Sequence, residues 1–135
     1  MTAGRVTTRS DAAVLAAQWR ASGARVVLAS GCFDLLSAGH TRFLREARSR
    51  GDRLIVVVLG DRSATSLGAG RPVLPARERG RIVAALRGVG AVIVAEGEEL
   101  PSIESELKPV EHSPAPAGAE AAAFANVIAA LGRSE

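Results

Sequence analysis

The chain has 135 residues, a formal net charge of +3 and four aromatic side chains, while 47% of its residues are hydrophobic. This composition predicts one domain whose core consists of Val, Leu, Ile and Ala, as in a parallel sheet buried on both faces. The arginines are scattered, which argues against a nucleic-acid-binding protein. The sequence has no apolar run of roughly 20 residues, which argues against a membrane span. A single cysteine and no recognisable leader segment favour a cytoplasmic location over secretion.

The first half of the chain alternates between helical and strand patterns. Residues Thr7–Ser22 are expected to form a helix capped by Ser10, followed by a strand at Arg25–Ala29. A second helix ends near Gly51, and the apolar run Leu54–Leu59 predicts a second buried strand. This alternation indicates a parallel sheet with right-handed crossovers.

The pattern continues up to about residue 107. A Gly-rich loop is expected at Ser63–Pro75, a helix from about Ala76 to Arg87, a third strand at Ala91–Val94 and a short helix at Pro101–Leu107. One α/β domain is therefore predicted over residues 1–109.

The last part of the chain has a different character. The proline-rich stretch Lys108–Gly118 predicts a linker, with a degenerate strand at Val110–Ser113 as the alternative. An Ala-rich helix is expected at Glu120–Leu131. We predict that residues 110–135 form a linker and a C-terminal helix packed on the same domain.

The segment Gly31–His40 carries the strongest functional signal. It joins the strand ending at Ala29 to a helix that begins near Thr41. A strand, a Gly-containing loop and a helix start together form an anion site, because the free N–H groups and the positive dipole end of the helix point at the ligand. Gly39 and His40 lie where a phosphate would arrive.

Other polar residues follow the strands at the same edge of the predicted sheet, where ligands of open α/β sheets bind. Their convergence predicts a polyphosphate site, with Mg²⁺ sharing the charge. These residues are Asp34 and Ser37 after the first strand, Asp61 and Arg62 after the second, Arg71 in the Gly-rich loop, and Arg77 and Arg79 at the next helix start.

Each of these residues also has a structural interpretation. His40 could pack at the helix start, Asp34 could cap the loop, and Arg77 could belong to a solvated face. Arg79 shares the apolar face of its helix and should point towards the sheet edge. Cys32 is expected to be a small packing residue.

The loop resembles the signature Gly-x-Phe-Asp-x-x-His-x-Gly-His of the cytidylyltransferase-like nucleotidyltransferases, with Ser37 in place of the first histidine. Residues from about Leu15 to Ala95 are similar to the adenylyltransferase domain of bacterial ADP-heptose synthesis proteins, and glycerol-3-phosphate cytidylyltransferases share the loop. Further matching motifs are Gly23-Ala24-Arg25-Val26-Val27, Gly51-Asp52-Arg53-Leu54-Ile55-Val56, Gly70-Arg71-Pro72 and Ala85-Leu86-Arg87-Gly88-Val89.

The resemblance implies a Rossmann-like three-layer α/β/α parallel sheet, shortened at the C-terminus, and a homodimer. It implies transfer of a nucleotidyl group from ATP or CTP, with Mg²⁺, to a sugar or polyol phosphate, without a residue set that holds the metal. The implied catalytic residues are His40, Ser37 and Arg79. The implied nucleotide-binding residues are Gly31, Cys32, Phe33, Asp34, Gly39, His40, Asp61, Arg71 and Arg79.

The chain departs from the family pattern at several places. Ser37 cannot supply the positive charge of a histidine, and the loss of one charge-stabilising group typically costs about 100- to 1,000-fold in rate. Gly60 replaces a serine after the second strand, and Gly90 replaces an aspartate before the third. The family's later Val-Lys-Gly and Ser-Thr-Thr motifs have no counterpart. A catalytically inactive relative that binds a nucleotide or a protein partner is therefore the alternative function.

Overall fold

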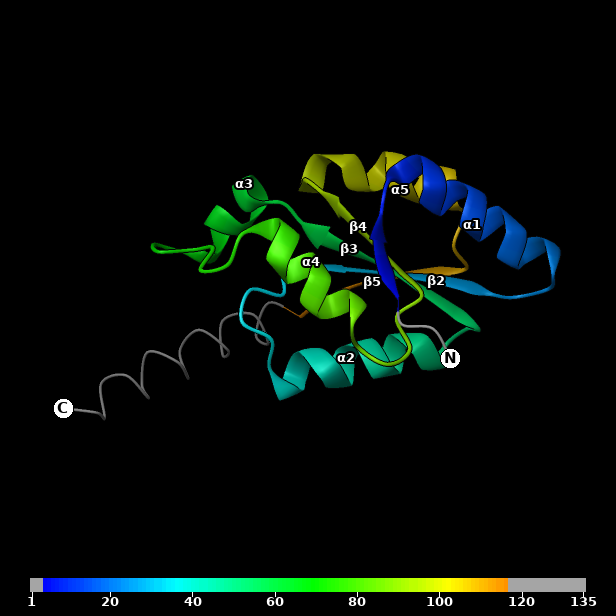
Figure 1. Cartoon of the computed structure of the whole chain (residues 1–135), viewed down its shortest axis with the longest axis horizontal. Helices are drawn as coiled ribbons and strands as arrows, with labels where there is room; N and C mark the ends of the chain where they lie inside the picture. The colour runs from blue at the N-terminus through cyan, green and yellow to red at the C-terminus, as the bar shows by residue number, and fades with distance from the viewer. Residues whose placement is uncertain (1–3, 117–135) are drawn as a thin grey trace.

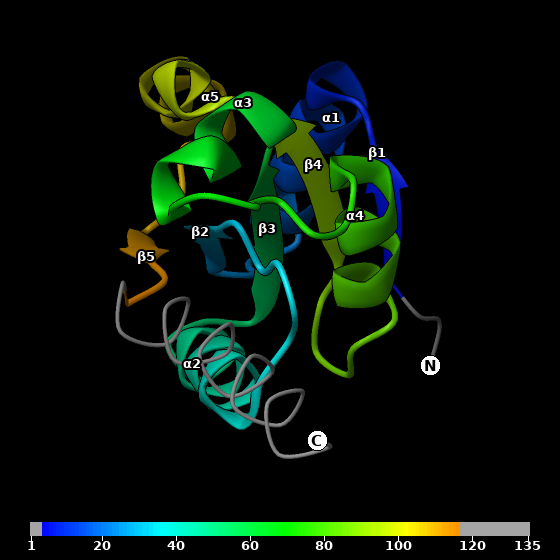
Figure 2. The same cartoon turned by 90° about the vertical axis from the view of Figure 1, so that its left-hand side faces the viewer.

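The computed structural model describes residues 4–116, and within this range five strands form one fully parallel sheet. Their order across the sheet is β1-β4-β3-β2-β5, so β1 and β5 form the two edges (Figure 1, Figure 2). The strands are β1 (Arg5–Thr7), β2 (Val26–Gly31), β3 (Arg53–Leu59), β4 (Ala91–Ala95) and β5 (Glu111–Pro114).

Helices cover both faces of the sheet, which confirms the Rossmann-like three-layer α/β/α arrangement. Helices α1 (Arg9–Ala21) and α5 (Leu100–Leu107) pack on one face (Figure 1). Helices α2 (Ala38–Ser49) and α4 (Ala76–Ala84) pack on the other. The short segments α3 (Asp61–Ala64), η1 (Thr65–Leu67) and η2 (Gly97–Glu99) follow the carboxyl ends of β3 and β4.

The direction of the chain across the sheet reverses at β2. From β2 the chain passes to β3 and β4, and then returns through α5 to β5 on the other side of β2. Ligands of open parallel sheets bind beyond the carboxyl ends of the strands at such a switch point. The signature loop, Gly31–His40, leaves β2 at this place.

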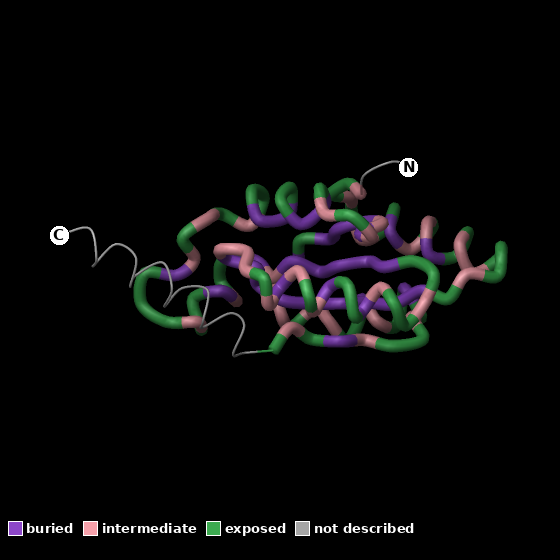
Figure 3. Tube along the Cα trace, turned by 90° about the horizontal axis from the view of Figure 1, so that it is seen from below, coloured by how far each residue is buried: buried purple, intermediate pink, exposed green. Residues whose placement is uncertain are grey.

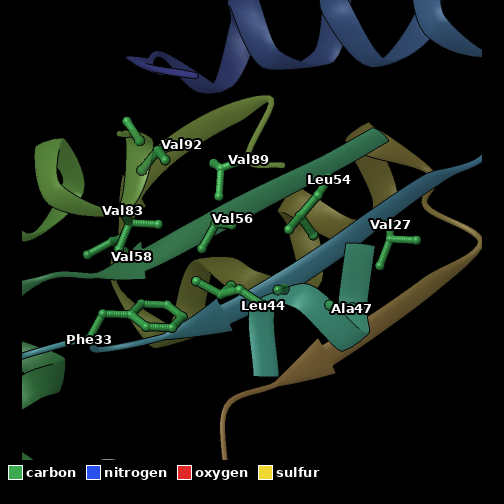
Figure 4. Packing of buried hydrophobic residues seen from close by; sticks show 12 residues of the cluster. Val27, Phe33, Leu44, Ala47, Leu54, Val56, Val58, Val83, Val89 and Val92 are labelled. Atoms are coloured by element: carbon green, nitrogen blue, oxygen red, sulfur yellow. The ribbon is translucent and has the colours of Figure 1, made fainter. Parts of the chain in front are cut away.

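Two aliphatic layers form the core. Because side chains alternate along a strand, Leu54, Val56 and Val58 of β3 face α2 and α4, whereas Ile55 and Val57 face α1 and α5. Figure 4 shows the first layer, and Figure 3 shows that the buried stretches follow the central strands. Burial on both faces explains the uninterrupted apolar run in the sequence.

The N-terminal part corrects two expectations. The segment Arg5–Thr7 forms the edge strand β1 beside β4, although three residues are too few for a periodic pattern to reveal. Helix α1 is capped by Thr8 and not by Ser10, because the Thr8 hydroxyl accepts a hydrogen bond from the backbone N–H of Asp11 (3.1 Å).

Later boundaries shift as well. Helix α2 ends at Ser49, and α4 ends at Ala84, after which the chain turns through Gly88 (φ 92°) into β4. The predicted loop after β3 begins with the helical segments α3 and η1. In the predicted linker, Glu111–Pro114 form β5, so the alternative of a degenerate strand is the one observed.

The predicted helix Glu120–Leu131 lies outside the described residues. Among residues 4–116, no helix combines the length and the apolar character that crossing a membrane requires.

Candidate functional site at the carboxyl ends of the strands

The signature loop has an unusual backbone conformation. Phe33 and Leu35 have φ values of 51° and 76°, in the left-handed region that non-glycine residues rarely adopt. Such conformations persist where surrounding contacts impose them, and they are common at functional sites. Phe33 is buried, and its ring lies edge-on to the His40 imidazole with centroids 5.3 Å apart. Packing between side chains of the loop therefore helps to fix its shape.

Gly31 is required by the close approach of the chain that follows β5. A Cβ atom at Gly31 would lie 2.7 Å from the Cβ of Ala115 and 3.0 Å from the Phe33 ring. The Ala115 N–H also donates to the Ser30 carbonyl (2.7 Å). The first residue of the signature loop thus serves the packing of β2 against the segment after β5.

Ser37 caps α2 and forms a reciprocal pair of hydrogen bonds with His40. The His40 N–H donates to Ser37 Oγ (3.3 Å), and the Ser37 N–H donates to His40 Nδ1 (3.1 Å). Because Nδ1 accepts this bond, the proton of a neutral His40 lies on Nε2. The residue that replaces the first histidine of the signature therefore sets the orientation and the tautomer of the second. Gly39 lies between them in the first turn of α2.

Asp34 is a buried anchor for the Gly-rich loop that precedes α4. Its carboxylate accepts hydrogen bonds from Arg71 Nε (2.7 Å) and from the backbone N–H groups of Val73 (2.8 Å) and Leu74 (2.9 Å). The side chains of Asp34 and Arg71 are 0% and 1% exposed. The signature aspartate thus holds the Gly-Arg-Pro loop against the signature loop.

The same contacts set the pKa of Asp34. Burial raises the pKa, but hydrogen bonds from the Leu74 and Val73 N–H groups and from Arg71, together with the positive charge of Arg71, lower it more. The net result is a pKa below the ordinary value, so the carboxylate is ionised in the folded protein at neutral pH.

Arg79 joins the carboxyl ends of two strands. Its Nη1 donates to the carbonyl oxygens of Cys32 (2.7 Å) and Leu59 (2.6 Å), and its Nε donates to the Leu74 carbonyl (2.9 Å). Its Nη2 donates to Asp61 Oδ1 (2.7 Å), and the Arg79 side chain is 0% exposed, against 55% for Asp61. To contact a ligand, Arg79 would have to exchange one of these partners, and the exposed Asp61 is the most accessible one.

The three predicted arginines do not converge. Arg71 and Arg79 are buried within the protein, whereas Arg77 lines a separate cavity of about 510 Å³ between β1 and α4, together with Arg5 and Arg81. The exposed Arg62 pairs with Glu98. Arg71 and Arg79 therefore support the signature loop in this conformation and do not face a ligand site. We call these two arginines and their partners Asp34 and Asp61 the frame.

Two departures from the family pattern have a physical explanation. A Cβ at Gly60 would lie 1.8 Å from Glu96 Oε2, so this glycine leaves space for the Glu96 carboxylate, which accepts hydrogen bonds from Ser63 N–H (2.8 Å) and Oγ (2.7 Å). A Cβ at Gly90 would lie 2.9 Å from Trp19 Cη2, so this glycine accommodates the indole.

A polar network on the α5 side of the sheet was not foreseen. Ser30 Oγ lies 2.8 Å from His112 Nε2, and His112 Nδ1 lies 3.1 Å from Glu104 Oε1. Ser30 is 2% exposed, so this serine–histidine–glutamate series links β2, β5 and α5 rather than presenting a nucleophile. The sequence did not predict this network, because His112 is a single histidine in a proline-rich stretch.

The arrangement can bind an anion at the start of α2. The N–H groups of Ala38 and Gly39 in the first turn of α2 point out of the helix end beside the signature loop, whereas the His40 N–H is bonded to Ser37 Oγ and the His40 ring is buried. The predicted residues Gly31, Cys32, Phe33, Asp34, Ser37, Gly39 and His40 lie in this one loop, with Asp61, Arg71 and Arg79 in the frame around it.

Known proteins with related sequences point to one family. The model of the family described as "Cytidylyltransferase-like" matches residues 28–121. The bifunctional protein HldE of Koribacter versatilis is 45% identical over 91 residues, which are 67% of this chain and 19% of that protein. HldE of Methylococcus capsulatus is 50% identical over 80 residues, 58% of this chain and 17% of that protein. The chain thus spans about a fifth of the length of these curated relatives.

A solved structure agrees in fold and sequence. The lipopolysaccharide core biosynthesis protein of Thermoplasma volcanium is 31% identical, with a TM-score of 0.62, over 67% of this chain and 73% of that one. The family match covers more than half of this chain, and it includes the second part of β2, the signature loop and the strands on both sides of β2. The chain belongs to the cytidylyltransferase-like family.

Proposed function

We propose that this chain is a nucleotidyltransferase domain, which transfers the nucleotidyl group of ATP or CTP to a sugar or polyol phosphate. The observation that carries the proposal is the interlocked Ser37–His40 pair at the start of α2, placed at the switch point of the sheet. This site offers hydrogen-bond donors to an anion at the place where open α/β sheets bind ligands.

The proposed reaction needs positioning and charge stabilisation more than proton transfer. An anionic phosphate oxygen of the acceptor attacks the α-phosphorus, a new P–O bond forms, and the bond from the α-phosphorus to the bridging oxygen breaks. Pyrophosphate leaves with the electron pair of that bond. In this proposal, the Gly39 N–H stabilises the negative charge on the phosphoryl oxygens, and Arg79 reaches the triphosphate by exchanging Asp61. His40 is buried, so its imidazole contacts the phosphates only if the signature loop rearranges when the nucleotide binds.

We infer that Mg²⁺ would be bound mainly through the nucleotide. Among residues 4–116, no three His, Cys, Asp or Glu side chains are placed to hold a metal ion, and both Asp34 oxygens already accept hydrogen bonds. Mg²⁺ keeps several waters and is usually held by phosphate oxygens with one or two carboxylates. Asp61, whose side chain is exposed, is the carboxylate that would bind Mg²⁺ together with the phosphates. When bound, the metal would neutralise phosphate charge.

Calorimetric titration with ATP and with CTP, each with Mg²⁺, tests the nucleotide site. Saturable binding of one nucleotide that is weakened at least about tenfold by His40→Ala would support the proposal. The matched control is Arg42→Ala, an exposed substitution on α2 outside the signature loop. Pyrophosphate release with a panel of sugar and polyol phosphates would then identify the acceptor. Binding that His40→Ala leaves unchanged would contradict this site.

Specific observations favour the second candidate, an inactive relative that binds a nucleotide or a protein partner. His40, Arg71 and Arg79 are buried, and Ser37 is engaged as a helix cap. Strand β5 ends at Pro114, without the lysine of the family's Val-Lys-Gly motif. The substitution Ser37→His separates the two candidates: it should raise pyrophosphate release if the site is otherwise complete, and should have no effect if catalysis has been lost.

We propose a homodimer for this domain and a cytoplasmic location. Within residues 4–116, β1 and β5 are the edge strands of the sheet, which supports self-association because open strand edges are normally covered or paired. Light scattering after size exclusion measures the oligomeric state directly, and a monomeric mass would contradict the dimer.

A further inference from the structure

A second cavity runs along α2 towards the amino ends of β3 and β4. Its volume is about 630 Å³, within the range of small-molecule sites. One wall is the stripe Thr41, Leu44, Arg45 and Arg48 of α2. The other wall is the connection from α4 to β4, residues 86–90, and the floor includes the start of β3. We call this space the arginine cavity.

The charge around the arginine cavity is strongly one-sided. Arg45, Arg48, Arg53 and Arg87 line it, and Asp52 is the one acidic residue among the lining residues. The Asp52 carboxylate accepts a hydrogen bond from the Arg25 N–H (2.7 Å). Neither Arg45 nor Arg87 forms an ion pair with another residue in the described part of the chain, and both are exposed. Two guanidinium groups are therefore available for an anion.

The inner part of the arginine cavity is apolar. Leu44, Leu54 and Val89 belong to the core layer beneath α2, and Leu86 packs against that layer. Each also lines the cavity, so a ligand that enters between the arginines meets aliphatic side chains below them. A basic rim above an apolar floor suits a molecule that has an anionic group at one end and an apolar group at the other.

We propose that the arginine cavity binds a small organic phosphate, with the phosphate between Arg45 and Arg87 and an apolar moiety against Leu44 and Leu86. Guanidinium groups match phosphate oxygens in bidentate geometry, and two of them suit a dianion. The site contains no residue of the signature loop, because its walls come from α2 after His40 and from the amino ends of β3 and β4. The proposal does not depend on nucleotidyl transfer.

The protein contains a natural reporter for this site. Trp19 is the only tryptophan, and it packs at the same end of the sheet on the opposite face, which α1 and α5 cover. The Arg53 guanidinium lies 5.3 Å from the centroid of the Trp19 ring, and Trp19 Cη2 approaches Gly90. Arg53 and Gly90 both line the arginine cavity. Occupation of the cavity should therefore change the emission of Trp19.

The test uses the full chain and phenyl phosphate as the probe. Titration should give a saturable change in Trp19 emission and a matching binding isotherm by calorimetry. Inorganic phosphate should bind at least about tenfold more weakly, because it cannot use the apolar floor. Phenol, which lacks the charge, should give no saturable change over the same range.

Variants locate the bound probe. The double substitution Arg45→Ala and Arg87→Ala should weaken phenyl phosphate at least about tenfold, since it removes two charge-assisted contacts. Arg42→Ala, an exposed change on α2 outside the cavity, should leave the affinity unchanged. Circular dichroism checks that each variant is folded.

Three results would overturn the proposal. The first is the absence of both a calorimetric isotherm and an emission change with phenyl phosphate. The second is binding that survives the double substitution, which would place the probe elsewhere. The third is equal affinity for phenyl phosphate and inorganic phosphate, which would mean that the cavity attracts anions without using its apolar floor.

Discussion

The two ends of the sheet use arginine in opposite ways. At the carboxyl end, Arg71 and Arg79 are buried, and their guanidinium groups bind carbonyl oxygens and carboxylates of the protein itself. At the amino end, Arg45 and Arg87 are exposed and line a cavity without ion-pair partners among the described residues. An arginine near a recognised motif is therefore not necessarily a ligand-binding group.

The comparison also explains how the signature loop keeps its shape. The donors of Arg79 hold the ends of β2 and β3, and Asp34 holds the Gly-Arg-Pro loop, so buried charges fix the frame. The N–H groups of Ala38 and Gly39, at the start of α2, are the donors that lie outside this frame. Substitutions in the frame should therefore lower the free energy of unfolding much more than substitutions of the exposed arginines.

The largest expected effect comes from removing the buried guanidinium. Arg79→Met leaves three carbonyl oxygens without their donor and should lower the free energy of unfolding by about 3–5 kcal/mol. The matched control, Arg77→Met, lies on the same helix but is exposed, and should stay within about 0.5 kcal/mol. Urea denaturation measures both. Equal effects of the two substitutions would mean that Arg79 is not part of the frame.

Asp34→Asn should have the next largest effect. An amide cannot accept all the bonds from Arg71, Val73 and Leu74, and we expect a loss of about 2–3 kcal/mol in unfolding free energy at neutral pH. Because the folded pKa lies below the ordinary 3.8, ionised Asp34 stabilises the protein fully above that value, and this contribution is lost as the pH falls through the folded pKa.

The stability difference between the original protein and Asp34→Asn should therefore shrink as the pH is lowered below about 3.8. Denaturation at a series of pH values measures it. Glu46→Gln, at an exposed carboxylate of α2, is the control and should show little change. A difference that stays constant down to acid pH would contradict an ionised anchor.

Ser37→Ala tests the helix cap and should cost about 1 kcal/mol, the usual value for a lost N-cap. Ser37→Thr keeps the hydroxyl and should recover most of that stability. The Ala variant should also loosen His40, because the Ser37 hydroxyl lies 3.2 Å from His40 Nδ1. Thermal unfolding measures the cost, and histidine NMR signals report the ring. Identical stability of the Ala and Thr variants would show that the cap contributes little.

Much of the fold could be predicted from the sequence because it depends on local patterns. The apolar runs of β2, β3 and β4 and the helical spacing of α2 each carry their own signal, and the strand–loop–helix order places Gly31–His40 at the sheet edge. Strands β1 and β5 are short and form the edges of the sheet within residues 4–116, so their sequences carry too little apolar pattern to identify them.

The candidate site was harder to predict because its roles depend on distant contacts. Sequence reasoning placed Arg79 on the inner face of its helix, which is correct, but it could not show that Cys32 and Leu59 carbonyls would take its donors. The Ser37–His40 pair is three residues apart and could have been found as a capping pattern. The contact of Ser30 with His112 joins residues 82 positions apart, beyond the reach of any local pattern.

The smallest expected effect concerns the other end of the sheet. Arg53→Ala removes an exposed cation above the Trp19 ring and should cost about 0.5–1 kcal/mol in unfolding free energy. It should also change the emission of Trp19, because the indole loses its charged neighbour. Arg45 lines the same cavity but is not the residue stacked on the indole. Arg45→Ala should therefore leave the free energy of unfolding and the Trp19 emission nearly unchanged in the absence of ligand. If Arg45→Ala altered the emission as much as Arg53→Ala, the emission of Trp19 would depend on the total charge around the arginine cavity and not on the stacked Arg53 guanidinium.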